Sequence, residues 1–261
     1  NGAFSGCTSL GRLEGIDLKN VETIGSMAFS GCTSLASVDL GKVTTIGYSA
    51  FSDCTSLASI DLGKVTTIEN YAFSRCRRLT SIDLGKVTTI ENYAFSLCSS
   101  LESIDLGKVT TIGENAFYGC TALGRLEGID LRNVKTIGKN AFYECNSLAS
   151  VALENVTTIE YEVFDGCTSL ASINLKNVQT IRGFAFYGCK ALETINLSSI
   201  QTIEQGAFSS CTGIKKVIMP QNSEKAEKIK DIICSQTGKK AGDGNGNTIG
   251  FISSPEPAAV T

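Results

Sequence analysis

The sequence predicts an α/β solenoid, a chain wound into many short coils, and three observations support this fold class. Ten cysteines from Cys7 to Cys211 recur in steps of 22 residues, with two steps of 25. One stretch of each unit alternates between apolar and polar residues, as in Ser59-Ile60-Asp61-Leu62, which the pleat of a strand requires. The same sequence pattern recurs along most of the chain. A fixed period in the low twenties with one short strand per unit is typical of solenoids.

Within one unit, the strand comes first and the rest is a return path. The apolar positions after the strand are spaced by three and five residues, which fits neither a strand nor a long amphipathic helix. We therefore expect short parallel strands that form one curved sheet, joined by mostly irregular or 3₁₀ returns. One unit is too small to bury its own apolar residues, so neighbouring coils must cover them. In the clearest unit these residues are Leu57, Ile60, Leu62, Val65, Ile68, Ala72, Phe73, Cys76 and Leu79.

The repeats and the C-terminal segment differ in composition. Residues 1–219 hold about ten repeats of 22–25 residues, and because the chain enters in the middle of a repeat we expect an N-terminally truncated solenoid. After Pro220, Asn222 or Ser223 can cap a helix over about 223–235, followed by a short strand over about 248–252. Residues 220–261 are thus expected to form a small helical cap on the open end of the solenoid, and a tail.

The repeat resembles the leucine-rich repeats, and within them the BspA-like (treponemal-type) class. That class carries I-x-x-x-A-F-x-x-C-x-x-L followed by x-x-I-x-L, which here occupies Ile46–Leu62, Ile68–Leu84 and Ile90–Leu106. The resemblance covers residues 2 to about 219, with Val163, Ile214 and Met219 as departures. It implies a cell-surface or secreted protein that binds other proteins, often in adhesion to a host matrix of the fibronectin or fibrinogen kind.

The outward positions of the strands are the first candidate binding surface. One column is acidic and its companion is mainly serine, and lysines follow the aspartates three residues later. A solvated ladder of mixed charge is one interpretation. The other is a face that receives a basic or hydrogen-bonding protein surface, or occasional calcium ions. The candidate residues are Asp39, Asp61, Asp83, Asp105 and Asp130 with Ser59, Ser81 and Ser103.

A second column follows the repeat phenylalanine and changes from serine to tyrosine at Tyr118, Tyr143 and Tyr187. Tyrosine is a common interface anchor, so these three form a candidate aromatic patch. Aromatic drift is the alternative, because Tyr48, Tyr71, Tyr93 and Tyr161 stand at other repeat positions.

Several chemistries find no support in the sequence. The chain has no histidine, which excludes Ser-His and Cys-His nucleophile pairs, and it has no phosphate-binding glycine loop, so we expect no enzyme and no cofactor. Zinc is not expected without histidine or a C-x-x-C pair, and the repeat cysteines are expected to be buried free thiols. The Asp243 loop lacks the glycine and glutamate of an EF-hand.

A heptapeptide is repeated at 10–16 and 123–129. It is either a neutral remnant of a duplication or a binding loop, and in both cases we expect Arg12 and Arg125 to be exposed.

Charge and hydropathy limit the partners. The net charge is −3, which gives no reason to expect nucleic acid, and no apolar run is long enough for membrane insertion. The predicted function is therefore a non-catalytic protein-binding solenoid, adhesin-like and surface-attached or secreted by resemblance. An intracellular or architectural scaffold of the same fold is the alternative.

Overall fold

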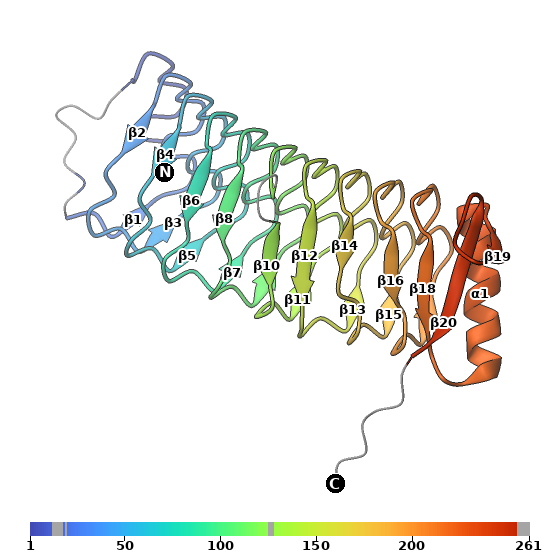
Figure 1. Ribbon diagram of the computed structural model, residues 1–261. Helices are drawn as coiled ribbons and strands as arrows, with labels where there is room; N and C mark the ends of the chain where they lie inside the picture. The colour runs from blue at the N-terminus through green and yellow to red at the C-terminus, as the bar shows by residue number, and fades with distance from the viewer. Residues whose placement is uncertain (12–17, 19, 125–127, 255–261) are drawn as a thin grey trace, which may run out of the picture.

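The computed structural model describes residues 1–11, 18, 20–124 and 128–254. Over this range the chain winds into an elongated stack of coils, with the first coil at one end and helix α1 (Ser223–Thr237) across the other (Figure 1). The α/β solenoid predicted from the repeat period is confirmed.

One row of parallel strands displays the Ser-x-Asp residues, and we call its outer side the strand face. The strands pair in register, so that Ser81 lies beside Ser103 and Asp83 beside Asp105. Hydrogen bonding divides the row into β2-β4, β6-β8 and a seven-stranded sheet from β10 to β19. The strands within the repeats are β2 (Ser37–Val38), β4 (Ser59–Ile60), β6 (Ser81–Asp83), β8 (Ser103–Asp105), β10 (Ile129–Leu131), β12 (Ser150–Leu153), β14 (Ser172–Ile173), β16 (Thr194–Asn196) and β18 (Lys216–Met219).

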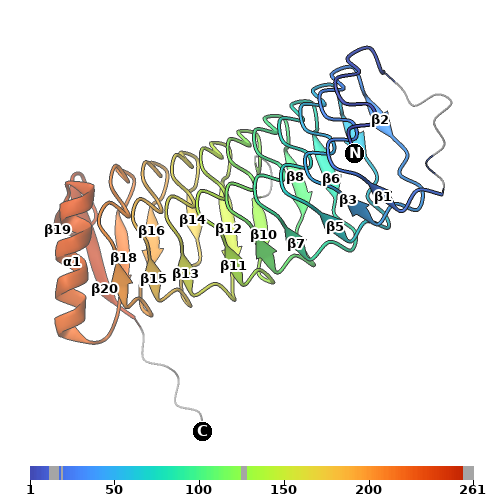
Figure 2. The same ribbon diagram turned by 180° about the vertical axis from the view of Figure 1, so that it is seen from behind.

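A second row of two-residue strands corrects the expectation of a single sheet. Most coils pair a Thr-Ile dipeptide in register with the next, and Figures 1 and 2 show this row running along the lower edge. It forms a six-stranded and a three-stranded sheet. The strands are β1 (Thr23–Ile24), β3 (Thr45–Ile46), β5 (Thr67–Ile68), β7 (Thr89–Ile90), β9 (Thr111–Ile112), β11 (Thr136–Ile137), β13 (Thr158–Ile159), β15 (Thr180–Ile181) and β17 (Thr202–Ile203).

The remaining return path consists of overlapping turns, and the described residues contain no 3₁₀ helix. In one coil the amides of Ala72, Ser74 and Cys76 each donate to the carbonyl three residues earlier, at 3.0–3.2 Å. The alternate amides donate to the next coil, as Phe73 does to Ala94 at 2.8 Å. Local turns and inter-coil bonds thus satisfy the backbone alternately, as a buried return path requires.

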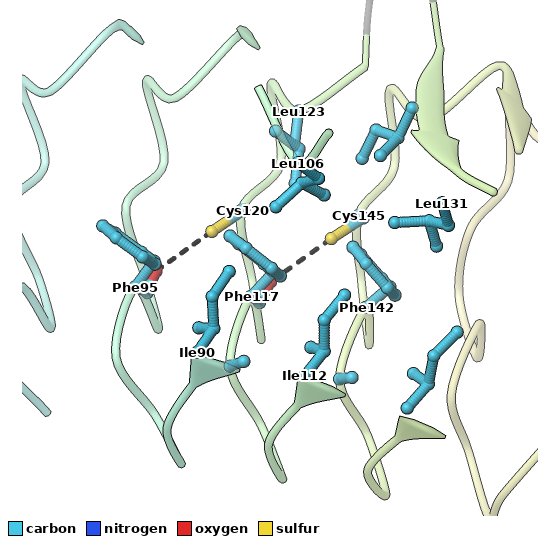
Figure 3. Packing of buried hydrophobic residues seen from close by; sticks show 14 of the residues in the cluster. Ile90, Phe95, Leu106, Ile112, Phe117, Cys120, Leu123, Leu131, Phe142 and Cys145 are labelled. Atoms are coloured by element: carbon cyan, nitrogen blue, oxygen red, sulfur yellow. Dashed lines mark hydrogen bonds between the residues drawn. The ribbon is translucent and has the colours of Figure 1, made fainter. Parts of the chain in front are cut away.

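The core is a file of phenylalanine rings, one from each coil. Ring centroids of neighbouring coils lie 5.2–5.6 Å apart and the rings are nearly parallel, with Phe51, Phe73 and Phe95 at 5.4 Å. Isoleucines, leucines and cysteines surround the file (Figure 3). Offset stacking at this spacing is the favoured arrangement of aromatic pairs.

The C-terminal segment supplies the last coil with the hydrogen-bond and packing partners that a further coil would provide. Within the coils, each phenylalanine amide donates to an alanine or valine carbonyl of the next coil; at Phe208 the acceptor is the side chain of Gln236 in α1, at 2.8 Å. Ile229 and Ile233 of α1 are buried, and the Asn222 side chain accepts a hydrogen bond from the amide of Lys225, in the first turn of the helix. Strand β20 (Thr248–Ser253) pairs with β18 and β19 (Lys240–Gly242) pairs with β20, which extends the strand face by two strands.

Candidate protein-binding surfaces

The aspartate column of the strand face is exposed and is built into the turn that follows each strand. Oδ1 of Asp39, Asp61, Asp83 and Asp105 accepts the amide of the glycine two residues later at 2.8–2.9 Å. This side-chain turn is a common use of aspartate and asparagine after a strand. Each of these four carboxylates therefore holds its own loop with Oδ1, and among the described residues Oδ2 makes no hydrogen bond.

Asparagine accepts the same hydrogen bond further along the column. Oδ1 of Asn174 accepts from the amide of Lys176 at 3.1 Å, and Oδ1 of Asn196 accepts from Ser198 at 3.0 Å. This hydrogen bond therefore depends on the side-chain acceptor and does not require its charge. Asp-to-Asn replacement in this column consequently removes charge while keeping the local structure.

The counter-charges expected from the sequence are only partly in place. Arg132 binds Asp130 through two side-chain nitrogens, with Nη2 at 2.7 Å from Oδ2, and this hydrogen bonding lowers the pKa of Asp130. Within the described residues no lysine forms an ion pair with the other four aspartates. Lys108 instead donates to the carbonyl of Gly85 at 3.1 Å. The acidic charge of the first coils is therefore left largely uncompensated.

The serine column lies beside the aspartates, and Ser59, Ser81 and Ser103 are exposed. A shallow hollow of about 640 Å³ opens over both columns at the first strands. Two further hollows, of about 450 and 300 Å³, lie where the aspartates meet the following glycines. The largest is lined by Ser37, Val38, Asp39, Ser59, Ile60, Asp61 and Asp83.

The tyrosine column is divided in two. The rings of Tyr118 and Tyr143 stack at 4.9 Å, but Asp165 occupies the next place in the column. Tyr187 follows after it and packs edge-on against Phe184 at 6.1 Å. The three sequence-predicted tyrosines therefore do not form one continuous stack.

A second aromatic file lies among the tyrosines that stand at other repeat positions, outside the sequence-predicted patch. Tyr71 and Tyr93 stack at 4.5 Å and Tyr48 packs on Tyr71 at 5.7 Å. The 22-residue interval between Tyr71 and Tyr93 is the signal that could have identified it. These tyrosines lie in the turns that follow the Thr-Ile strands.

The repeat cysteines are free thiols, and nine of them are buried. They are more than small apolar residues, because each buried Sγ donates to a phenylalanine carbonyl of the preceding coil, as Cys120 does to Phe95 at 3.1 Å (Figure 3). Burial raises the pKa of Cys54 and of Cys98 to about 12. These thiols stay protonated and are poor nucleophiles and metal ligands.

The described part of the chain has neither a cluster of metal-ligating residues nor a helix that could span a membrane. It contains no group of three or more cysteine or acidic residues that could hold a metal ion. Asp243 instead organises its own loop by accepting from Asn245 and Thr248, which lowers its pKa. No helix of the described chain is long and apolar enough to span a bilayer. Arg12 and Arg125, expected to be exposed, lie outside the described residues.

Comparison with known proteins identifies the repeat. The family model of the BspA type leucine rich repeat region matches residues 1–124 and 125–239. A leucine rich cell surface protein from Faecalibacterium prausnitzii is similar in structure, with 26% identity over 79% of each chain and a TM-score of 0.50. No relative is found among curated proteins.

Two further solved structures share the fold. A leucine-rich repeat protein from Eubacterium ventriosum has 21% identity over 78% of this chain and 71% of its own, with a TM-score of 0.54. The pneumococcal vaccine antigen PcpA has 18% identity over 78% of this chain and 61% of its own, with a TM-score of 0.51.

Proposed function

Because the chain belongs to the BspA-type leucine-rich repeat family, we propose that it is a non-catalytic protein-binding solenoid that engages its partner through the strand face. The observation that supports this best is the row of exposed carboxylates, five successive coils long, beside a serine column. Residues 1–219 would form the binding solenoid, and 220–261 its C-terminal cap and tail. The row comprises Asp39, Asp61, Asp83, Asp105 and Asp130, with Ser59, Ser81 and Ser103 beside it.

The electrostatics favour a basic partner surface for the first coils. Carboxylates one strand spacing apart repel one another by about 1 kcal/mol or more per pair before salt screening. A partner that brings lysine or arginine side chains relieves this repulsion and is steered toward the face during encounter. The serine hydroxyls add donors and acceptors for hydrogen bonds at the same spacing.

The site of action is proposed to be the bacterial surface or the secreted fraction. The similar protein from Faecalibacterium prausnitzii is described as a cell surface protein, and PcpA as a vaccine antigen. We propose an adhesin-like role, with matrix proteins of the fibronectin or fibrinogen kind as the first partners to test.

The experiment uses immobilised fibronectin and fibrinogen and measures binding of the full chain by biolayer interferometry. Asp61→Asn, Asp83→Asn and Asp105→Asn are combined, because asparagine keeps the turn while the charge is lost. Loss of three charge-assisted contacts should weaken binding by about tenfold or more, and less at high salt.

The matched control is a triple lysine variant on the loops, Lys42→Gln, Lys64→Gln and Lys86→Gln, which raises the negative charge instead. This control should bind as tightly as the wild type or more tightly. Equal affinity of the wild type and the asparagine variant would remove the acidic row from the binding site. Absence of wild-type binding to both proteins would overturn the matrix-binding proposal.

A further inference from the structure

A second surface lies in the turns that precede the repeat cysteines, away from the strand face residues in every coil. We call it the aromatic corner and define it as Tyr118, Tyr143, Phe184 and Tyr187. The side chains of Phe184 and Tyr187 are 45% and 41% exposed, among the most exposed large apolar residues that the structure describes. Exposed aromatic groups of this kind mark interaction sites more often than isolated surface residues do.

The four rings form two pairs that flank one coil. Tyr118 stacks on Tyr143 on one side, and Phe184 packs edge-on against Tyr187 on the other. Tyr143 and Tyr187 stand two coils apart at the same repeat position, so the interval between them is about 10 Å at the usual strand spacing. The column residue between them is Asp165, whose side chain is shorter than that of tyrosine.

The coil in the interval presents carboxylates. Asp165 holds the column position between Tyr143 and Tyr187, and Glu162 and Glu144 lie close enough to act on it electrostatically. Burial raises the pKa of Asp165 to about 6, and these two glutamates act in the same direction. Among the described residues no lysine or arginine forms an ion pair with these three carboxylates. A cation is therefore the complementary charge.

The chain contains a neighbouring example of the same chemistry, already filled. Arg182 lies over the ring of Tyr161, 5.9 Å from its centroid, and binds Glu204 with Nη1 at 2.6 Å from Oε1. An aromatic face and a carboxylate thus receive a guanidinium together in the turns that precede the repeat phenylalanines. Arginine suits such a site better than lysine because its planar group both stacks and binds carboxylate in a fork.

We propose that the aromatic corner is a second docking surface, and that it takes an arginine side chain from an exposed segment of a partner protein. The guanidinium lies between the pairs Tyr118–Tyr143 and Phe184–Tyr187 and hydrogen-bonds to Asp165. Its recognition differs from that of the strand face, where charge predominates and aromatic side chains are absent from the candidate row. The two surfaces can therefore be inactivated separately.

The test measures fluorescence anisotropy of a labelled peptide, acetyl-Gly-Arg-Gly-Arg-Gly, with the full chain. The variant combines Tyr143→Ser, Phe184→Ser and Tyr187→Ser, because the chain itself has serine at these repeat positions in Ser30, Ser49 and Ser52. Removal of the aromatic contacts should weaken binding by about tenfold. Asp165→Ser, which introduces the same column residue, should weaken it to a similar degree.

Three controls decide the outcome. Tyr71→Ser with Tyr93→Ser removes aromatic groups elsewhere and should leave peptide affinity unchanged, as should the strand-face asparagine variant. A peptide with citrulline in place of arginine should bind at least about tenfold more weakly, since it keeps the shape and loses the charge. Circular dichroism confirms that each variant is folded.

The proposal is overturned if the triple serine variant binds the peptide like the wild type, or if the citrulline peptide binds equally well. It is also overturned if the strand-face variant loses as much affinity as the corner variant, because binding would then reflect net charge alone. A wild-type chain that shows no binding of the arginine peptide would overturn it as well. None of these results depends on whether the strand face binds a matrix protein.

Discussion

Replacement of Phe95 by alanine tests the ring file at its centre. Phe95 is fully buried and stacks on Phe73 at 5.4 Å and on Phe117 at 5.6 Å. Burial and cavity effects give about 3–5 kcal/mol for Phe→Ala in a core, and stacked pairs contribute about 0.5–1.5 kcal/mol each. Because two ring contacts are lost and the adjacent coils are held in place by their own hydrogen bonds, we expect a loss near the upper end, about 4–5 kcal/mol.

The position of the substitution matters as much as its size. In a solenoid each coil contacts only its neighbours, so a break at the centre uncouples two halves while a break near an end releases only the last coils. Phe95→Ala should therefore split urea unfolding into two transitions. Phe29→Ala, which lies between Phe4 and Phe51 near the first coil, should leave one main transition with little change in its midpoint.

Urea titration followed by far-ultraviolet circular dichroism gives the free energies, and native-state hydrogen exchange shows which coils open. Phe95→Leu is the matched control, because it keeps most of the volume and should cost about 1–2 kcal/mol, chiefly the stacking. A cost for Phe95→Ala below about 1 kcal/mol, or identical behaviour of the Phe95 and Phe29 variants, would refute the ring file as the main source of stability.

Three further predictions concern the thiols, one carboxyl group and the turns. Iodoacetamide should label Cys7 and Cys234 in the folded chain and the nine buried thiols only in urea, because burial keeps those thiols protonated and covered. Mass spectrometry of peptides from native and unfolded samples measures this labelling. Labelling of Cys98 under native conditions would contradict the prediction. The pKa of Asp165 is raised by burial from 3.8 to about 6, so ionisation destabilises the folded state progressively between those pH values and fully above them. Asp165→Asn should thus raise stability at neutral pH by about 1 kcal/mol after solvent screening, with the gain vanishing below pH 3.8, as thermal unfolding against pH will show. Arg75 has a left-handed backbone with φ of 60°, so Arg75→Gly should raise the free energy of unfolding, measured by urea titration, by about 0.5–1 kcal/mol. Arg77→Gly, at a position without positive φ, should lower it by a similar amount.

The strand face and the ring file could be predicted from the sequence because side-chain periodicity specifies both. Ile60 and Leu62 alternate with polar neighbours, and Phe73 repeats without a gap at the same place in each unit. A residue buried in one coil must be buried in the next, since the coils are nearly identical. The register of the strands then follows directly from the repeat length.

The second strand row and the turns could not be predicted in the same way. Thr67 and Ile68 are too short a run to show alternation, and they pair as strands only because the preceding coil presents the same dipeptide. Tyr71 and Arg75 both adopt positive φ, which propensity alone assigns to glycine. Their amides donate to the next coil, and this inter-coil bonding holds a conformation that the local sequence disfavours.

The candidate surfaces show the same division. The exposure of Asp61 and Ser59 follows from strand alternation, but the hydrogen bond by which Asp61 holds Gly63 is visible only in the folded chain. The recurring Asp-Leu-Gly spelling was the available signal, since aspartate two residues before glycine is a common turn pattern. The separation of Tyr143 from Tyr187 by Asp165 was visible in the sequence, whereas the pairing of Tyr187 with Phe184 was not.

The backbone explains where surface chemistry can change at little cost. In the described coils most amides of the return path bond to local turns or to neighbouring coils, so an exposed column position can change without loss of these backbone hydrogen bonds. The strand face loses its charge after Asp130, at Ala152, and the corner gains tyrosine after Ser96, at Tyr118. Both changes fall in the middle of the chain and neither is required by the fold. The acidic row and the aromatic corner therefore differ in the coils they occupy, and under the two proposals above one solenoid would hold two partner segments at once.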